Sequence, residues 1–320
     1  MRALEVTDTS GPGGIQLIDI EPPGHREGHV LVRVEAVAAT FPDLLMSKGL
    51  YQIRPPLPFV TGSDFAGTVI AAPEAAHVGV GQRVAGFVDF GAAAEVINVP
   101  VAQVYPLPDG VSSVPGSAMA MNYLTAHFAL AIRGDATPGD WVLVHGAAGG
   151  VGIASIQVAR GLGARVISVA STDRKRAATL DAGADHAIRP DEVPLMAKEL
   201  TGGRGVDIVV DPVGGDMMAD SLRSLAPFGR VMVVGFASGE IPVVKVNRLL
   251  LRNIDIRGVE QSLMVQQGRT LQQWRDLTPL IESKVIAPIV NPARPITEFA
   301  TGLRAIDERK ALGRLVFTID

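Results

Sequence analysis

A glycine-rich turn between a short apolar run and a helix-like run most constrains what this chain can fold into. Residues 144–152 (VHGAAGGVG) follow the apolar run 141–145 (WVLVH). Ala147, Gly149 and Gly152 stand at the three small-residue positions of a dinucleotide fingerprint, which serve the tight turn, the approach to a pyrophosphate and helix–strand packing. A helix beginning here would offer unpaired N–H groups to the phosphates. The turn predicts a nucleotide site, with a purely structural turn as the alternative.

The residues after this turn alternate between apolar strands and helices. Short apolar runs suited to buried strands lie at 141–145, 165–170, 206–211, 230–235 and 253–257. Helical patterns cover 149–162 and 174–182, and a further helical run, 119–133, precedes the turn. Strands that alternate with helices predict a parallel sheet, and continuously apolar strands predict that both of its faces are covered.

The first 120 residues have a different pattern. Runs such as 29–36 (HVLVRVEA) and 67–72 are rich in β-branched residues and bounded by Gly, Pro and Asp, which predicts short strands. After the α/β region come a helical stretch at 270–283 and an apolar run at 314–319 that reads as a terminal strand. Periodicity alone leaves open whether this tail returns to the β-rich first part.

Composition narrows the class of protein. A length of 320 residues suggests two domains, and 47% hydrophobic with 19% charged residues is typical of a globular protein. The net charge of −4 predicts no general attraction to nucleic acid or anionic membranes. There is no cysteine and the six histidines are scattered, so we expect no disulfide, no thiol nucleophile and no bound metal. Without a long apolar run or a signal-like N-terminus, we expect a cytoplasmic enzyme with no membrane association.

The end of the second apolar run bears on which nicotinamide cofactor would bind. An acid is typical there when NAD is bound, but this chain has Ala170 and Ser171, followed by Arg174, Lys175 and Arg176. A hydroxyl and cations suit a 2′-phosphate, which favours NADPH, held by Lys175 and Ser171. The alternative is a solvated first helical turn capped by Asp173.

Four further side chains invite a functional interpretation. His145 and Asp211 end two of the predicted strands and could act as an acid–base pair, but hydrogen bonding to loop backbone is the favoured interpretation. Trp141 and Trp274 are interpreted as core or interface residues.

Several motifs together resemble one family. They are 41–43 (FPD), 49–51 (GLY), 56–67 (PLPFVTGSDFAG), 122–126 (NYLTA), 146–152 (GAAGGVG), 211–215 (DPVGG) and 234–236 (VGF). Across essentially the whole chain they are similar to the zinc-independent NADPH:quinone oxidoreductases, the zeta-crystallin-like branch of the medium-chain dehydrogenase/reductase superfamily.

This resemblance implies an organisation. A Rossmann-type, doubly wound parallel sheet would bind NADPH, and a GroES-like β-rich domain would be formed by both chain ends. The expected boundaries are 1–121 for the first part of the substrate domain, 122–259 for the Rossmann domain and 260–320 for the return to the substrate domain. The resemblance also implies NADPH between the two domains, a homodimer, and no metal.

The resemblance also assigns cofactor contacts by position. The pyrophosphate would lie on Ala148, Gly149, Gly150 and Val151, and the 2′-phosphate on Ser171 and Lys175. The adenosine side would be lined by Val213 and Gly214, and the nicotinamide end by Gly235, Phe236, Asn122 and Thr125. Arg314 is a further cofactor contact.

The catalytic candidates are Thr40, Tyr51 and Asn122. Relatives often have Asn where this chain has Thr40 and Tyr where it has Leu45, so the expected nicotinamide pocket is less polar than usual. Thr40 or Asn122 could stabilise negative charge on the acceptor oxygen. Tyr51 matches a proton donor of related enoyl-thioester reductases, although a Tyr in such a turn can also be structural.

The predicted function is hydride transfer from NADPH to a small quinone or other α,β-unsaturated carbonyl acceptor. One alternative is an enoyl-thioester reductase acting on coenzyme A or carrier-bound substrates. An alternative of another class is a protein that binds NADPH without turnover. Such a protein could also bind RNA, although the net charge disfavours this. The physiological acceptor and one- versus two-electron reduction are left open by the sequence.

Overall fold

The computed structural model describes residues 1–319, which form two compact units. The first unit contains Met1–Met121, Gly268–Trp274 and Pro288 onward, and the second contains Asn122–Gln267 and Arg275–Ala287. Each unit has its own sheet and core. Within residues 1–319, no helix has the length and apolar character needed to cross a membrane.

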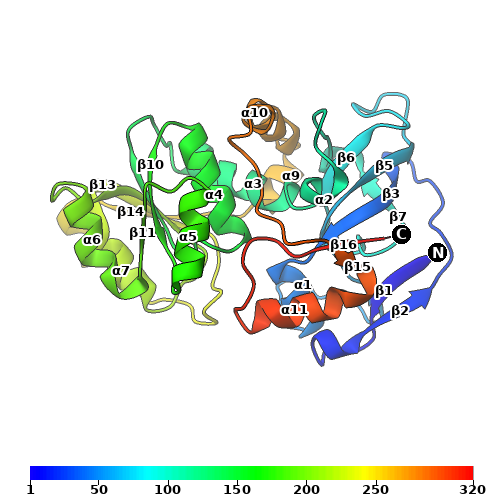
Figure 1. Cartoon of the computed structure of the whole chain (residues 1–320), viewed down its shortest axis with the longest axis horizontal. Coiled ribbons are helices and arrows are strands. Elements are labelled where there is room, and N and C mark those ends of the chain that lie inside the picture. Colours follow the sequence, from blue (N-terminus) through cyan, green and yellow to red (C-terminus); the bar gives the residue numbers. More distant parts are fainter. Residues whose placement is uncertain (320) are drawn as a thin grey trace. The chain divides into compact units, whose positions relative to one another are not determined.

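The second unit is built on a six-stranded sheet in which every neighbouring pair is parallel (Figure 1). In sheet order its strands are β11 (His186–Ile188), β10 (Arg165–Val169), β9 (Trp141–Val144), β12 (Val206–Asp211), β13 (Leu225–Val233) and β14 (Asp255–Gly258). The chain starts at β9, adds strands on one side and then crosses to the other, so the helices of the two halves cover opposite faces. The predicted doubly wound parallel sheet is confirmed.

The helices of this region include the three predicted helical runs and several that were not predicted. They are α3 (Ala120–His127), the π-helix η3 (Phe128–Arg133), α4 (Gly150–Gly161), α5 (Asp173–Asp181), η4 (Pro190–Glu192), α6 (Val193–Leu200), α7 (Met217–Ser224), α8 (Asn247–Arg252) and α9 (Ser262–Gln266). The helical run predicted at 119–133 therefore changes from α- to π-helix at Phe128. The sheet's core is lined by apolar side chains such as Leu143, Ile167 and Val209, which are fully buried.

The first unit contains a seven-stranded sheet and a three-stranded sheet. The larger sheet holds β15 (Arg294–Pro295), β16 (Val316–Thr318), β3 (His29–Ala38), β5 (Asp64–Ala71), β6 (Arg83–Phe87) and β8 (Val104–Pro106), with β7 (Val96–Pro100) paired to β3. The smaller holds β2 (Ile15–Asp19), β1 (Arg2–Val6) and β4 (Phe59–Val60). The helical elements are η1 (Pro12–Gly14), α1 (Phe41–Ser47), η2 (Val101–Gln103), α2 (Ser113–Gly116), η5 (Ile296–Glu298) and α11 (Phe299–Asp307).

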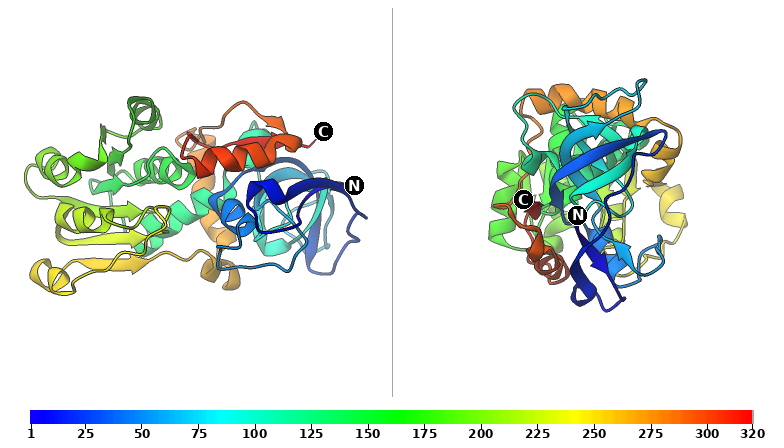
Figure 2. Two further views of the ribbon diagram at one scale, coloured as in Figure 1. Left: turned by 90° about the horizontal axis from the view of Figure 1, so that it is seen from below. Right: turned by 90° about the vertical axis from the view of Figure 1, so that its right-hand side faces the viewer.

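The C-terminal segment completes the core of this first unit. Strand β16 pairs antiparallel with β3, and Phe299, Leu303 and Phe317 share a buried cluster with N-terminal residues such as Val32 and Phe65. The red C-terminal elements accordingly lie beside the blue N-terminal strands in Figures 1 and 2. The β-rich domain expected from both chain ends is therefore confirmed.

Helix α10 (Thr270–Glu282) is divided between the two units, which differs from the expected return at residue 260. Its first part belongs to the first unit because Trp274 stacks on Tyr105, with ring centroids 5.2 Å apart. The Trp274 indole N–H also donates to the Pro106 carbonyl at 2.9 Å. This fits the interpretation of Trp274 as a core residue.

The residues after α10 belong to the second unit for a similar reason. The backbone N–H of Ala287 donates to Gln157 Oε1 (3.0 Å), and Gln157 Nε2 donates back to the Ala287 carbonyl (2.8 Å). Because Gln157 lies on α4, this pair of hydrogen bonds ties the segment to the parallel sheet's first helix. The chain then returns to the first unit at Pro288.

Candidate functional site

The glycine-rich turn joins β9 to α4 and leaves the start of the helix open. Gly149 is the N-cap residue, and no side chain caps the first N–H groups of α4. A Cβ on Gly152 would lie only 2.5 Å from the Ala147 Cα and the Gly146 carbonyl oxygen, so only glycine permits this close packing. Gly149 is exposed, and Gly150 and Val151 are partly exposed. The turn therefore presents unpaired backbone donors to an anion.

The turn stands where the strand order of the sheet reverses. Strand β9 is flanked by β10, which follows it, and by β12, which comes later in the chain. In open α/β sheets, ligands bind outside the carboxyl ends of the strands at such a point. The topology and the open helix therefore place a candidate nucleotide site at this edge of the second unit.

The end of β10 carries the two residues predicted to meet a 2′-phosphate. Ser171 is exposed and Lys175 is partly exposed on the first turn of α5. Thr172, and not Asp173, caps this helix, because its hydroxyl accepts from the Lys175 backbone N–H. Arg176 pairs with Asp173 and donates to the Ala170 carbonyl, so it is already engaged within the turn. Ser171 and Lys175 are the two residues that the sequence predicts for a 2′-phosphate at this strand end.

Two loops at the same edge of the sheet interlock. Val213 and Gly214 follow β12, and Gly235 and Phe236 follow β13. The Ser238 N–H donates to the Val213 carbonyl at 2.9 Å, and the Ala237 N–H donates to the preceding Pro212 carbonyl at 3.0 Å. Phe236 is 37% exposed, so its ring is accessible to a ligand. The four predicted contacts therefore belong to one joined loop pair.

Helix α3 holds the candidates Asn122 and Thr125, both buried. The side-chain nitrogen Nδ2 of Asn122 is buried and has no hydrogen-bond partner among the described residues. Leaving a buried amide donor unpaired costs about 1–3 kcal/mol. An acceptor atom of a ligand would remove that cost, so the geometry of Asn122 fits a ligand contact.

In the first unit, Thr40, Asp43, Ser63, Asp64 and Arg314 form what we call the polar cluster. Asp43 accepts from the Thr40 hydroxyl (2.7 Å), the Thr40 backbone N–H (2.8 Å) and the Ser63 hydroxyl (2.7 Å). Burial raises the pKa of Asp43, against the hydrogen bonds from Ser63 and Thr40. The hydroxyl proton of Thr40 is thus donated to Asp43. Thr40 would have to break this hydrogen bond before it could donate to a substrate.

Asp64 and Arg314 form the charged half of the polar cluster. Arg314 donates to Asp64 Oδ2 at 2.8 Å, and the Met121 backbone N–H donates to Oδ1 at 3.3 Å. Burial raises the pKa of Asp64 to about 7, and the charge of Arg314 opposes the rise. Arg314 is 7% exposed, and its Nε is buried without a partner among residues 1–319. An ion pair and an unused donor therefore coexist on Arg314, which was predicted to contact the cofactor.

Tyr51, the predicted proton donor, lies in the bend that follows α1. Its ring packs against the buried cluster of Val6, Met46 and Phe59. A partly buried ring held by apolar neighbours fits the structural interpretation as well as the catalytic one.

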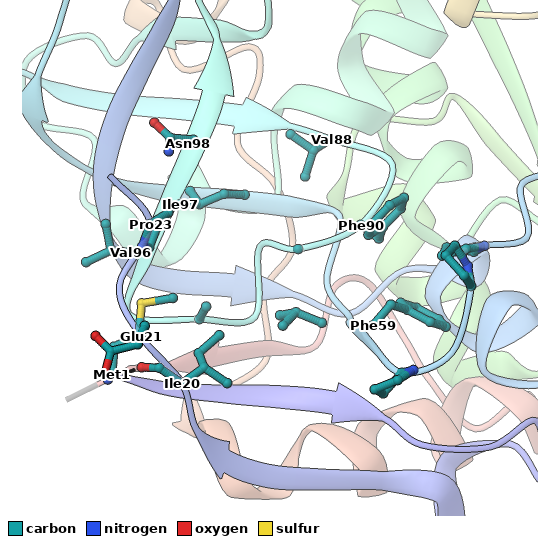
Figure 3. A pocket seen from close by; sticks show the side chains of 16 residues that line it. Met1, Ile20, Glu21, Pro23, Phe59, Val88, Phe90, Val96, Ile97 and Asn98 are labelled. Carbon is teal, nitrogen blue, oxygen red and sulfur yellow. Dashed lines mark hydrogen bonds between the residues drawn. The ribbon is translucent and has the colours of Figure 1, made fainter. Parts of the chain in front are cut away.

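The first unit also contains a pocket that sequence reasoning missed (Figure 3). Its volume is about 470 Å³ and most of its lining is apolar. Phe59 and Phe90 meet edge to face at one end, with ring centroids 5.8 Å apart, and Met1 and Ile20 lie at the other. The lining comes from segments far apart in the sequence, so no local pattern could have predicted it.

A doubly wound parallel sheet with an open glycine turn, together with a β-rich domain built from both chain ends, defines the class of the medium-chain dehydrogenases/reductases. Two family models match the chain: "Alcohol dehydrogenase GroES-like domain" over residues 26–109 and "Zinc-binding dehydrogenase" over residues 150–283.

Individual relatives narrow the class. The chain is 38% identical over 262 residues to quinone oxidoreductase-like protein 2 of Rattus norvegicus, covering 81% of this chain and 74% of the relative. A mycobacterial protein complexed with NADPH matches over the full length of both chains with a TM-score of 0.91 and 32% identity. The quinone oxidoreductase of Thermus thermophilus, also solved with NADPH, matches over both full lengths with a TM-score of 0.85 and 34% identity. The chain belongs to the zinc-independent quinone oxidoreductase family.

The description of the second family model raises the question of zinc. The chain has no cysteine, and residues 1–319 contain no group of three or more His, Asp and Glu side chains able to hold a metal ion. The two carboxyl groups of the polar cluster already accept from Thr40, Ser63 and Arg314. This donor set does not fit zinc.

Proposed function

We propose that this protein is an NADPH-dependent oxidoreductase that transfers a hydride to a quinone or another α,β-unsaturated carbonyl acceptor. The observation that carries the proposal is the uncapped start of α4, which lies at the strand-order reversal and leaves its N–H groups available to a pyrophosphate. Membership of the quinone oxidoreductase family and the NADPH-bound structures of relatives support it.

The residues of the second unit fit this cofactor. Ala148, Gly149, Gly150 and Val151 would hold the pyrophosphate, Ser171 and Lys175 the 2′-phosphate, Val213 and Gly214 the adenosine side, and Gly235, Phe236, Asn122 and Thr125 the nicotinamide end. The buried, unpaired Nδ2 of Asn122 supports this assignment because it lacks only an acceptor. Arg314 would be a further contact through its unpaired Nε.

When bound, NADPH supplies the hydride. The chain's own task is to hold the acceptor in line and to exclude water. Asn122 would donate a hydrogen bond to the acceptor oxygen as negative charge develops there, and Thr40 would do so only by releasing Asp43. A proton would then reach the product from water or from Tyr51.

We also propose that the protein is a homodimer. Strand β14 is the last strand of the six-stranded sheet, so one of its edges lacks a partner strand within the described residues. Beside it in the sequence, five large apolar side chains are at least 75% exposed: Ile241, Val243, Val246, Leu250 and Leu251. Exposed apolar side chains and an open sheet edge both favour association with a second copy. Light scattering after gel filtration tests this, and Leu250→Glu should shift the mass toward the monomer.

Turnover measurements test the acceptor class. The loss of NADPH absorbance is followed with 1,4-benzoquinone, an alkenal and crotonyl-coenzyme A, with NADH in parallel. Turnover with the quinone or the alkenal supports the proposal. Turnover confined to crotonyl-coenzyme A would identify an enoyl-thioester reductase, and NADPH binding with no turnover would favour the binding protein.

The cofactor preference has a matched pair of variants. Lys175→Ala should reduce the preference for NADPH over NADH by about tenfold, because one charge-assisted hydrogen bond at a partly exposed site is lost. Arg174→Ala removes the neighbouring exposed cation and should leave the preference within about twofold. Equal effects of both substitutions would contradict a specific contact at Lys175.

A further inference from the structure

Two buried polar side chains end neighbouring strands of the parallel sheet and have no role in the proposed reaction. His145 follows β9 and Asp211 ends β12, and the His145 backbone N–H donates to the Val210 carbonyl at 3.0 Å, which extends the pairing of the two strands. Each is 1% exposed. At this depth neither side chain can exchange a proton with a substrate, so their value must come from what they hold in place.

Asp211 holds the loop that follows its own strand. Its Oδ1 accepts from the backbone N–H groups of Val213 and Gly214, both at 2.9 Å. Its Oδ2 is buried and has no partner within residues 1–319. One carboxylate oxygen therefore makes both of the side chain's hydrogen bonds, and both of them fix the backbone of this loop.

That loop needs to be held because two consecutive glycines leave its backbone free to adopt many conformations. Gly214 and Gly215 have φ values of +70° and +60° in succession. A Cβ on Gly214 would lie 2.8 Å from a Phe236 ring carbon, and one on Gly215 would lie 2.9 Å from the Ser238 hydroxyl. The loop after β12 thus fits tightly under the loop after β13, and moving one displaces the other.

Backbone hydrogen bonds extend this coupling. The Val234 N–H donates to the Asp211 carbonyl at 2.9 Å, and the Gly215 N–H donates to the Glu240 carbonyl at 3.0 Å. A Cβ on Gly146 of the glycine-rich turn would lie 3.1 Å from a Val213 methyl carbon. The glycine-rich turn and the loop after β13 therefore both pack against the segment that Asp211 fixes.

His145 links the end of β9 to helix α7 through Ser221. Its Nε2 lies 2.9 Å from the Ser221 hydroxyl, which itself donates to the Met217 carbonyl on α7 at 2.9 Å. Burial lowers the pKa of His145, and Asp211 and Asp220 oppose this effect. A neutral imidazole fits a group that links β9 to α7 rather than one that moves protons.

We propose that Asp211 is a positioning residue that sets the affinity for the dinucleotide by locking the loops after β12 and β13, with His145 and Ser221 bracing it. This inference rests on the proposed function, because the ligand concerned is NADPH. The role needs an acceptor oxygen at the place of Oδ1 and no negative charge. It is therefore distinct from acid–base catalysis, which would need the carboxyl proton.

Calorimetric titration of NADPH into the full-length protein tests the proposal without turnover. Asp211→Ala removes both hydrogen bonds and should weaken binding by about tenfold or more. Asp211→Asn keeps an acceptor oxygen for the backbone N–H groups of Val213 and Gly214, so binding should stay within about threefold.

Asp207 on the same strand is the matched control. It lies at the opposite end of β12, where it accepts from the Trp141 backbone N–H at 2.8 Å and pairs with Arg204. Asp207→Ala should lower the melting temperature and leave the dissociation constant for NADPH unchanged. If Asp211→Ala does not fold, Asp211→Ser replaces it, because its shorter side chain cannot reach both amide groups.

The outcomes separate the two claims. Failure of the wild-type protein to bind NADPH would overturn the proposed function and the inference together. Wild-type binding with equal affinity of Asp211→Ala would overturn the inference alone, as would a large loss of affinity in Asp207→Ala. A loss of turnover in Asp211→Asn without a loss of affinity would assign Asp211 a catalytic role and also overturn the inference.

Discussion

Burial of Asp64 predicts a specific pH dependence of stability. The folded protein holds this carboxyl at 0% exposure and raises its pKa to about 7, from an ordinary value of 3.8. Between these values the folded state keeps a proton that the unfolded state has released, so the free energy of unfolding falls as the pH rises. The limit for one proton is about 1.4 kcal/mol per pH unit, which amounts to about 2 kcal/mol between pH 5 and pH 7 because the group is partly ionised near its pKa.

Asp64→Asn isolates this contribution because it removes one titrating group and keeps the shape. Urea unfolding of both proteins at pH 5, 6 and 7 gives the difference in free energy, and wild type should lose about 2 kcal/mol relative to the variant across that range. Asp109→Asn, at an exposed loop position, measures the effect of losing any carboxylate. A difference that stays constant with pH, or that grows in favour of wild type, would refute the reasoning and show that the attraction of Arg314 exceeds the cost of burial.

Three further substitutions test packing and hydrogen bonding by urea unfolding. Gly302→Ala would press a Cβ into the Phe317 ring and should cost about 1–3 kcal/mol, and the double variant with Phe317→Leu should recover part of it. Trp274→Phe keeps the stacked ring but loses its indole hydrogen bond, so we expect a loss of about 1 kcal/mol. Gln157→Leu leaves the Ala287 amide and carbonyl groups unpaired and should cost about 2 kcal/mol or more, and a value near zero would show that water replaces the side chain.

The parallel sheet was predictable because its signals are local. The runs 141–145 and 206–211 are largely apolar, and the glycine turn ends one of them, so periodicity and turn chemistry agree. The structure gives β9 and β12 nearly the same bounds. The short strand β11 was not identified from its sequence pattern, because three residues such as 186–188 (HAI) are too few to establish a period.

The candidate site was only partly predictable. The glycine-rich turn around Gly149 and the cation Lys175 indicate phosphate binding from the local sequence alone. The pairing of Asp64 with Arg314, in contrast, joins residues 250 positions apart. The Thr40–Asp43 contact spans three residues and forms a helix capping box, so the local sequence could have indicated it, but no local pattern shows that the Asn122 amide lacks a partner within the described part of the chain. Such facts depend on which groups the tertiary structure removes from water.

The late position of Arg314 and β16 in the chain determines the order in which the molecule can be completed during synthesis. A ribosome that has translated residue 287 has made every segment of the second unit, but strand β3 still lacks β16 and Asp64 still lacks Arg314. The first part of the chain to be made is therefore the last to be finished. During translation, the apolar core of the first unit stays accessible to chaperones and proteases until Phe299, Leu303 and Phe317 have been made and pack into it.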